Sequence, residues 1–494
     1  MNRQFPPATY EEQELPQYRY NPLIECLPPI RSIETLAKMM QHDVPYDSSQ
    51  RFLRDEVRKH AVQAIEQFYA PMPRHLTFAE TFSAMLRSGY ESRNPVNPIY
   101  WTGLAAQRAI LSSHLSDKQQ PTGPLKLGTS IVGPSGIGKS LAVDNTLKLY
   151  PQIVQHTSYR GNPFPFLQLT WLKLACPFSG SIKGLTQNFF HSVDWMLGTS
   201  YARHYVGSKT AIEMMPHIAT VGVLHGLGCL IIDEIQHLKA APSGGIQVML
   251  NFFVEMENTM QIPILLLGTP KALGVLTSEF RSARRASGQG AMCWDRMQND
   301  DCWKIFCKRM WALQYTKTEV PLTDEIIATL HDLTQGIPAL ATILYKTAQE
   351  TVIGEQEAVT IEVLRETCQN SFKLSHPFLS VLRGNKKKSC LEMADLEWPD
   401  FVQLEQDIAD KRAEAALGIA EVKTPSLAEE PLEEATPEKS KRSKPGQRKA
   451  KVFARGPLGA FELAKLEKRK VYDVLKEQGF ILNVNCLFPE EQMA

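Results

Sequence analysis

The chain has 494 residues, of which 43% are hydrophobic and 22% are charged; this is ordinary globular composition, and the length predicts about three folded units. Its formal net charge of +1 excludes attraction to nucleic acid through overall charge, so any such contact needs a local basic patch. The nine cysteines form no C-x-x-C pair, which argues against a zinc site, and no apolar run approaches the length that crosses a bilayer.

The first 30 residues predict an extended N-terminal arm. They are rich in Pro, Tyr and Gln, and they lack the apolar block of a signal peptide, so we expect an intracellular, cytoplasmic protein with reduced thiols. The arm is either disordered or a binding segment for a partner. From Ile30 onward apolar residues recur at helical spacing, which predicts a small helical domain over residues 31–100 ending in the polar turn Gly89–Pro95.

A phosphate-binding motif follows. The stretch Gly133-Pro134-Ser135-Gly136-Ile137-Gly138-Lys139-Ser140 fits G-x-x-x-x-G-K-[ST]. An apolar lead-in predicts a strand before it and Leu141–Leu149 predicts a helix after it, which is the context that such a loop requires. Its glycines let backbone N–H groups face phosphates at a helix N-terminus. We expect Lys139 to reach the β- and γ-phosphates of ATP and Ser140 to bind Mg²⁺. The alternative is a glycine-rich turn that matches by chance.

Three more apolar stretches predict strands, and helices are predicted between them. The strands are Phe166–Ala175, Gly228–Ile232 and Ile264–Gly268. The helices are Leu185–Leu197, Ala211–Leu227 and Ile246–Glu257. Strands that alternate with helices predict an α/β fold with a parallel sheet covered on both faces. We therefore expect a P-loop ATPase core over residues 101–320.

The C-terminal third predicts a helical lid, a linker and a tail. The lid, residues 321–383, follows from helices at Thr323–Leu333, Pro338–Ala348 and Ile361–Gln369, preceded by a helix or edge segment at Asp300–Ala312. Residues 384–455 predict a linker, acidic and then basic, that is not a folded domain. Residues 456–494 predict a tail with a basic amphipathic helix, which either docks on a partner or folds back onto the body.

Two carboxylates at the end of an apolar strand predict the second half of an active site. Asp233 can join Ser140 in the Mg²⁺ shell, and Glu234 can orient a water for in-line attack on the γ-phosphorus. This pair favours hydrolysis over simple nucleotide binding. The alternative is an acidic pair that starts the next helix. Thr269, at the tip of a neighbouring strand, can report on the γ-phosphate or can simply end its strand.

Two sets of cations are candidates for further roles. Arg281, Arg284 and Arg285 can supply an arginine finger that acts on a neighbouring subunit's nucleotide, or they form a solvated basic face. The second set comprises Lys173, Lys183, Arg203 and Lys209, which can face a ring's pore and contact DNA phosphates without reading bases. Its alternative is also a solvated surface. No histidine has metal-like spacing.

Taken together, these motifs resemble the AAA+ ATPases, and more closely the TnsC/TniB family of transposition regulators. The resemblance covers about residues 50–370. It rests on the stretches already described, together with the lid stretch Thr334–Pro338, the turn Gly89–Pro95 and the turn Ser181–Leu185. One departure matters: AAA+ lids often carry an Arg soon after the position of Gly336, whereas Ile337-Pro338-Ala339 follows here.

The resemblance implies a bacterial, ATP-dependent homo-oligomer, a ring or helical filament, that encircles duplex DNA. It implies a target selector bound through the N-terminal side and transposase subunits bound through the C-terminal tail, with ATP hydrolysis controlling assembly and release. One rival is a helicase-loader or initiator-type ATPase, which would share every core motif. Another is a nucleotide-gated scaffold with little turnover, against which Glu234 argues.

Overall fold

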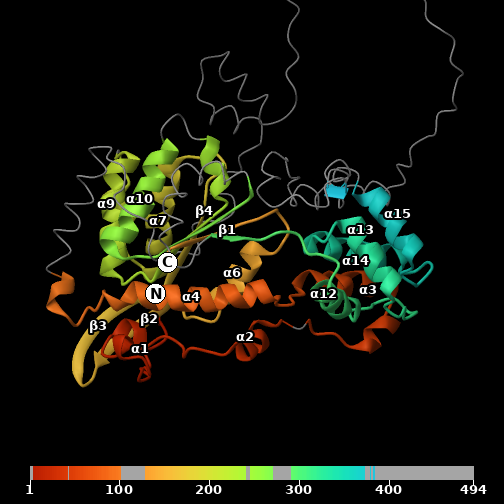
Figure 1. Ribbon diagram of the computed structural model, residues 1–494, viewed down its shortest axis with the longest axis horizontal. Coiled ribbons are helices and arrows are strands. Elements are labelled where there is room, and N and C mark those ends of the chain that lie inside the picture. The colour runs from red at the N-terminus through yellow and green to blue at the C-terminus, as the bar shows by residue number, and fades with distance from the viewer. Residues whose placement is uncertain are drawn as a thin grey trace, which may run out of the picture. The chain divides into compact units, whose positions relative to one another are not determined.

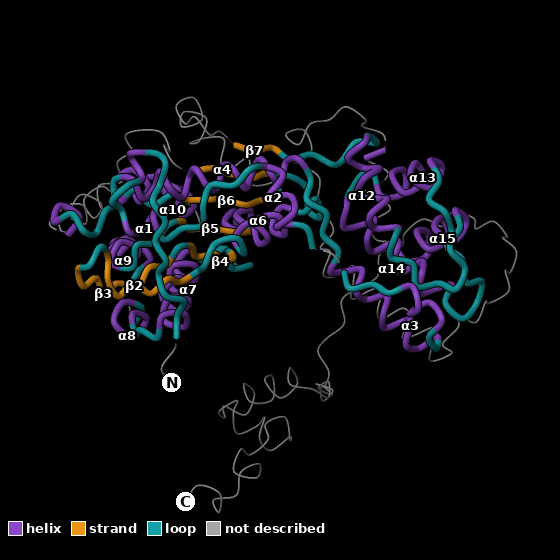
Figure 2. The backbone as a smooth tube through the Cα atoms, turned by 90° about the horizontal axis from the view of Figure 1, so that it is seen from below, coloured by secondary structure: helices purple, strands orange, loops and turns teal. Residues whose placement is uncertain are grey.

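The computed structural model describes residues 4–42, 44–101, 128–207, 209–240, 245–270, 291–372, 379 and 382–383 (Figures 1 and 2). These lie in one compact unit, Met1–Ala420, and the second unit is Glu421–Ala494. The predicted linker, the predicted tail and the arginines Arg281, Arg284 and Arg285 lie outside the described residues. Among the helices of the described ranges, none combines the length and apolarity that crossing a membrane requires.

The central sheet has five parallel strands in the order β4-β5-β6-β1-β7. They are β4 (Trp171–Ala175), β5 (Cys229–Asp233), β6 (Ile264–Gly268), β1 (Thr129–Val132) and β7 (Ala291–Cys293). Every residue of β1, β5 and β6 is buried, which explains why these strands read as continuous apolar runs. The register pairs Val132 with Gly268, and Ala175 with Asp233, so the carboxyl ends of the strands share one edge.

Helices cover both faces of the sheet, as the sequence predicts. On one face lie α4 (Pro73–Glu91) and α6 (Lys139–Leu147), packed on inward side chains such as Ile231 and Leu265. On the other lie α7 (Ile182–Leu197), α9 (Ala211–Leu224) and α10 (Gly245–Met260), packed on Leu230 and Leu266 (Figure 1). Successive residues of a strand serve opposite faces, so both helix layers share one sheet. The short helix α8 (Tyr201–Tyr205) follows α7.

The single strand predicted at Phe166–Ala175 is wrong. The chain forms an antiparallel hairpin of β2 (Ile153–Tyr159) and β3 (Asn162–Leu169), and β4 begins only at Trp171. Thr170 separates them because its N–H donates to Gln152 O. The hairpin turn has Arg160 at φ 50° and Gly161 at φ 81°. Two positive φ values are typical of a tight hairpin, and X-Gly was the sequence signal for it.

The N-terminal arm is packed rather than loosely extended. A 3₁₀ turn η1 (Pro16–Tyr18) and a short helix α1 (Pro22–Glu25) place Leu23 and Ile24, both 0% exposed, in the core beside α4. Farther out, the Tyr10 hydroxyl hydrogen-bonds His156 Nδ1 on β2 at 2.7 Å. The Pro-rich composition predicted an extended arm, but the arm is packed because the apolar side chains of α1 are buried in the core.

Residues 31–100 divide between two cores. They contain α2 (Ile33–Met40), η2 (Ser48–Phe52), α3 (Asp55–Ala61), η3 (Val62–Gln67) and α4. Val62 and Ile65 join the hydrophobic cluster of the lid helices, whereas α4 joins the sheet. The lid helices are α12 (Asp301–Trp311), α13 (Asp324–Thr334), α14 (Pro338–Val352) and α15 (Ile361–Ser371). Residues 31–100, the N-terminal segment, thus connect the sheet to the lid.

Candidate nucleotide-binding site

The loop between β1 and α6 has the backbone that its glycines predict. Gly138, the N-cap of α6, has φ 91°, a conformation that side chains rarely adopt. A Cβ on Gly133 would stand 2.3 Å from Trp294 O. Lys139 is 9% exposed, and its Nζ donates to Gly133 O at 2.7 Å and to Pro134 O at 2.8 Å. The ammonium therefore lies over the loop, where an anion would compete with these carbonyls.

The acidic pair lies at the same sheet edge. Asp233 ends β5 and is 7% exposed, and Glu234 follows it with φ 57°. A left-handed backbone costs a non-glycine residue about 1–2 kcal/mol, and such strain concentrates at functional sites. The Glu234 N–H donates to Asp233 Oδ1 at 2.9 Å, and the 3₁₀ helix η4 (Ile235–Ala240) begins at once. This turn directs Glu234 into the pocket beside the phosphate loop.

Lys173 lies in the nucleotide region, not on an open basic surface. Its Nζ is 2.6 Å from Asp144 on α6 and 3.2 Å from Asp233. The β4–β5 register explains this, because Lys173 pairs with Ile231, two residues before Asp233. Its side chain is only 22% exposed. Lys173 therefore supplies positive charge beside a candidate metal ligand, and its predicted contact with DNA stays a prediction.

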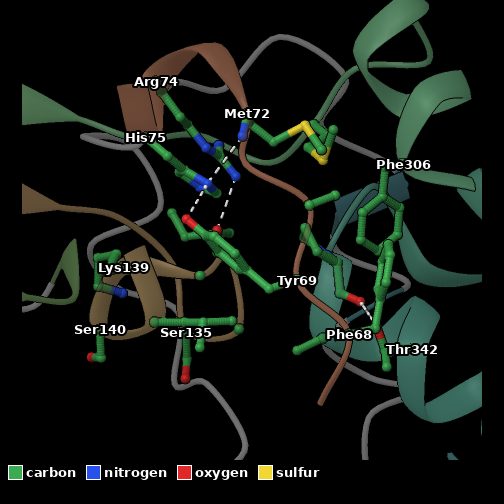
Figure 3. Close-up of a pocket in the computed structure, with 18 of the residues that line it drawn as sticks. Phe68, Tyr69, Met72, Arg74, His75, Ser135, Lys139, Ser140, Phe306 and Thr342 are labelled. Carbon is green, nitrogen blue, oxygen red and sulfur yellow. Dashed lines mark hydrogen bonds between the residues drawn. The ribbon is translucent and has the colours of Figure 1, made fainter. Parts of the chain in front are cut away.

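A cavity of about 480 Å³ adjoins the phosphate loop (Figure 3). One wall is the loop itself, Ser135–Leu141, and another is the start of the lid helix α14 with Pro338, Ala339 and Thr342. The Ala339 N–H donates to Gly136 O at 3.2 Å, which joins the lid directly to the loop. Ile337, in the stretch where other lids often have Arg, is 0% exposed. This stretch therefore contacts the loop through its backbone.

The third wall is the segment before α4, to which the sequence predictions gave no role. Phe68, Tyr69 and Met72 line the cavity, and the Phe68 ring packs against Phe306 of α12 with ring centroids 5.6 Å apart (Figure 3). The wall is apolar and aromatic, as a flat heterocycle requires. The sequence did contain a signal, because two aromatics precede Pro71 and Pro73 directly, but without the fold nothing connected them with the loop.

Two polar groups complete this wall. Arg74 donates to Ile137 O at 2.9 Å and to Asp295 O at 2.7 Å, which fixes the segment to the phosphate loop. His75 Nδ1 accepts the Met72 N–H at 3.2 Å, so the hydrogen of the neutral ring is on Nε2. Burial, aided by Arg74, lowers the pKa of His75 to about 3, and the ring stays neutral near pH 7.

Thr269 lies where the sequence predicts, directly after β6 at the same edge. Its N–H donates to Gln236 Oε1 at 3.1 Å, and its hydroxyl is buried without a hydrogen-bond partner among the described residues. Gln236, in η4, also contacts the Glu234 carboxylate. Gln236 was not among the predicted site residues, since a glutamine after an acidic pair carries no signal of its own.

Of the remaining DNA candidates, Lys183 lies at the amino end of α7, Arg203 lies in α8 and Lys209 lies just before α9. Lys183 and Arg203 are exposed, and Lys209 Nζ lies 3.4 Å from His217 Nε2 and over the Tyr205 ring. The pKa of the Glu213 carboxyl is lowered first by hydrogen bonds from Thr210, and Lys209 and Lys183 add to this. Lys183 and Lys209 therefore both lie near Glu213 and belong to one patch of surface.

The site fits a magnesium nucleotide on its own chemistry. Buried Asp233, with Lys173 as a neighbouring cation, is an acceptor at the phosphate end. The described residues contain no cluster of three or more His, Cys, Asp or Glu that could hold a metal. A P-loop magnesium site needs none, because nucleotide oxygens complete the shell that Ser140 and Asp233 begin.

A match to a family model supports the fold. Residues 126–276 match the family model described as AAA domain. The chain is similar to the solved ORC2 protein of Aeropyrum pernix (12% identity, 65% of this chain and 86% of that chain, TM-score 0.34). It is also similar to Cdc6p of Pyrobaculum aerophilum (14% identity, 63% and 85%, TM-score 0.36). None of the curated proteins matches it.

The AAA domain match and the five-stranded parallel sheet confirm the AAA+ P-loop fold. The closer resemblance to TnsC/TniB stays a prediction.

Proposed function

We propose that this chain is an AAA+ ATPase that assembles in its ATP-bound form on duplex DNA and couples a target selector to a transposase. The convergence of Lys139, Asp233 and Glu234 at one sheet edge, beside a cavity that the lid helps to line, carries the ATPase part. The DNA and transposition parts rest on the motif resemblance and on the exposed cations near α7. Hydrolysis would release the assembly.

Each residue has a distinct role in this proposal. Lys139 and the loop N–H groups would bind the phosphates, and Ser140 and Asp233 would hold Mg²⁺, which neutralises charge on the transferring phosphoryl group. Glu234 would orient the attacking water and accept its proton. The apolar wall of Phe68, Tyr69 and Phe306 would receive the base.

Nucleotide binding would change the position of the lid. The bond from Ala339 to Gly136 joins α14 to the phosphate loop, and Arg74 joins the N-terminal segment to the same loop. A bound nucleotide would contact all three walls and favour one lid position. Such a shift is what nucleotide-dependent assembly requires.

Electron microscopy with duplex DNA tests the assembly. We expect rings or filaments around DNA with a non-hydrolysable ATP analogue and none with ADP, because only the γ-phosphate reaches Glu234 and Thr269. The Lys139→Ala variant is the control and should not assemble in either nucleotide. Monomers in every condition would contradict an assembling switch and leave an ATP-binding protein.

The salt dependence of DNA binding tests the cationic patch. For Lys183→Ala with Arg203→Ala, we expect the slope of log affinity against log salt to become shallower by about two. Lys38→Ala with Lys59→Ala removes the same charge from exposed sites on α2 and α3 and should leave the slope unchanged. Equal slopes for both double variants would exclude Lys183 and Arg203 as DNA contacts.

Partner binding separates the two AAA+ alternatives. A transposition regulator should bind transposase subunits and lose them when residues 456–494 are deleted. A helicase-loader or initiator-type ATPase should bind a replicative helicase instead.

A further inference from the structure

The Gln236 side chain bridges two strand ends of the nucleotide site. Its Nε2 donates to Glu234 Oε2, and its Oε1 accepts the Thr269 N–H at 3.1 Å. Glu234 follows β5 and Thr269 follows β6, strands that lie side by side in the sheet. One amide group therefore connects the candidate water-orienting carboxylate to the backbone of its neighbour.

The partners fix the orientation of this amide. A backbone N–H can only donate, so the atom facing Thr269 is the oxygen. An ionised carboxylate can only accept, so the atom facing Glu234 is the nitrogen. A flipped amide would oppose two donors at one end and two acceptors at the other. Gln236 thus satisfies both neighbours in one orientation only.

The Thr269 hydroxyl is the group through which a ligand could affect the Gln236 bridge. Its hydroxyl is buried and has no hydrogen-bond partner among the described residues, which is costly for a polar group unless a ligand supplies one. A phosphate oxygen or the attacking water at this edge would supply it. Any shift of Thr269 on binding then moves the N–H that Gln236 accepts.

We propose that Gln236 is a positioning residue that transmits the state of Thr269 to the Glu234 carboxylate and so sets the rate of hydrolysis. The inference rests on the proposed ATPase function. Gln236 acts through Glu234, because its amide already occupies one oxygen of that carboxylate. Glu234 itself has a left-handed backbone, with φ 57°, a strain that concentrates at functional sites.

Kinetics of two Gln236 variants test this role. For Gln236→Ala we expect kcat to fall between about ten- and a hundredfold, because a misplaced catalytic group loses its alignment, with the KM for ATP within about twofold. Gln236→Glu keeps the acceptor for Thr269 but opposes Glu234 with a like charge, so it should lose at least as much. Gln155→Ala, exposed on β2, is the matched control and should be unchanged.

A double-mutant cycle separates positioning from mere support. In single-turnover assays Gln236→Ala should lower the residual rate of the Glu234→Gln variant by less than about twofold, because the group it positions is already gone. An unchanged kcat in both Gln236 variants would overturn this inference but not the proposed function. The same would follow if Gln236→Ala lowered the rate of the Glu234→Gln variant as much as it lowers that of the wild type. Absence of magnesium-dependent turnover in the wild type would overturn the proposed function and this inference together. If Gln236→Ala fails to fold, Gln236→Glu decides.

Discussion

In the Glu234→Gln variant, ATP turnover should fall by about two to three orders of magnitude while ATP affinity stays within about threefold of the wild type. The amide keeps the size of the side chain and can still contact Gln236, but it cannot accept a proton from water. Lys139, Ser140 and the aromatic wall remain to bind the nucleotide. Turnover from released phosphate and affinity from a fluorescent ATP analogue measure the two quantities separately.

The same variant tests the release step. If hydrolysis is the off switch, Glu234→Gln complexes on DNA should persist in ATP for far longer than wild-type complexes. Glu80→Gln, an exposed change on α4, is the control and should dissociate as the wild type does. Complexes of unchanged lifetime, formed by a variant that no longer hydrolyses ATP, would show that something other than hydrolysis ends the assembly.

The strands β1, β5 and β6 and the phosphate loop were predictable because local pattern determines them. Buried parallel strands read as apolar runs, and the strand Ile264–Gly268 was predicted with the observed bounds. The loop motif needs only a strand before it and a helix after it, and β1 and α6 supply them. Lid helices were predicted within a few residues for the same reason, since their apolar spacing is strong.

The features that were not predicted depend on contacts between segments that are distant in the sequence. The hairpin of β2 and β3 was missed because its strands are half exposed, so the apolar signal was weak. The wall of Phe68, Tyr69 and His75 is part of the site only because Arg74 joins it to Ile137, across more than sixty residues of sequence. The carboxylates of Asp144 and Asp233 beside Lys173 were also not predictable, because the spacing of residues along the chain does not reveal which residues the fold brings together.

A buried ion pair joins the N-terminal segment to the lid. Arg58 on α3 is 0% exposed, and its two Nη atoms donate to the two carboxylate oxygens of Glu357, each at 2.6 Å. Glu357 also accepts the backbone N–H groups of Gly354 at 2.9 Å and Lys317 at 3.1 Å. With Asp55 on the remaining side, every partner of this guanidinium is an oxygen from the chain.

Removing the carboxylate should therefore be costly. In Glu357→Ala the Arg58 charge stays buried with its bidentate partner gone, and we expect a loss of about 3–5 kcal/mol in the free energy of unfolding. Glu319→Ala is the matched control, because it breaks the Arg51–Glu319 pair, whose acid is 71% exposed, and should cost less than about 1 kcal/mol. Denaturant titration of both variants at pH 7 measures the difference; equal losses would mean that burial does not strengthen the Arg58 pair.

The stability that the pair contributes also depends on pH, and the direction of this dependence follows from the pKa of the Glu357 carboxyl. The hydrogen bonds from Arg58, followed by the smaller contributions of the two backbone N–H groups, hold the pKa of Glu357 far below its usual range. A lowered folded-state pKa contributes stability that is fully present above the unfolded value, near 4.3, and is lost as the pH falls below it. The difference in unfolding free energy between wild type and Glu357→Gln should thus be constant from pH 6 to 8 and should narrow steadily below about pH 4. A difference that widened on acidification would show that Glu357 is protonated in the folded chain, and the pair with Arg58 could not then be ionic.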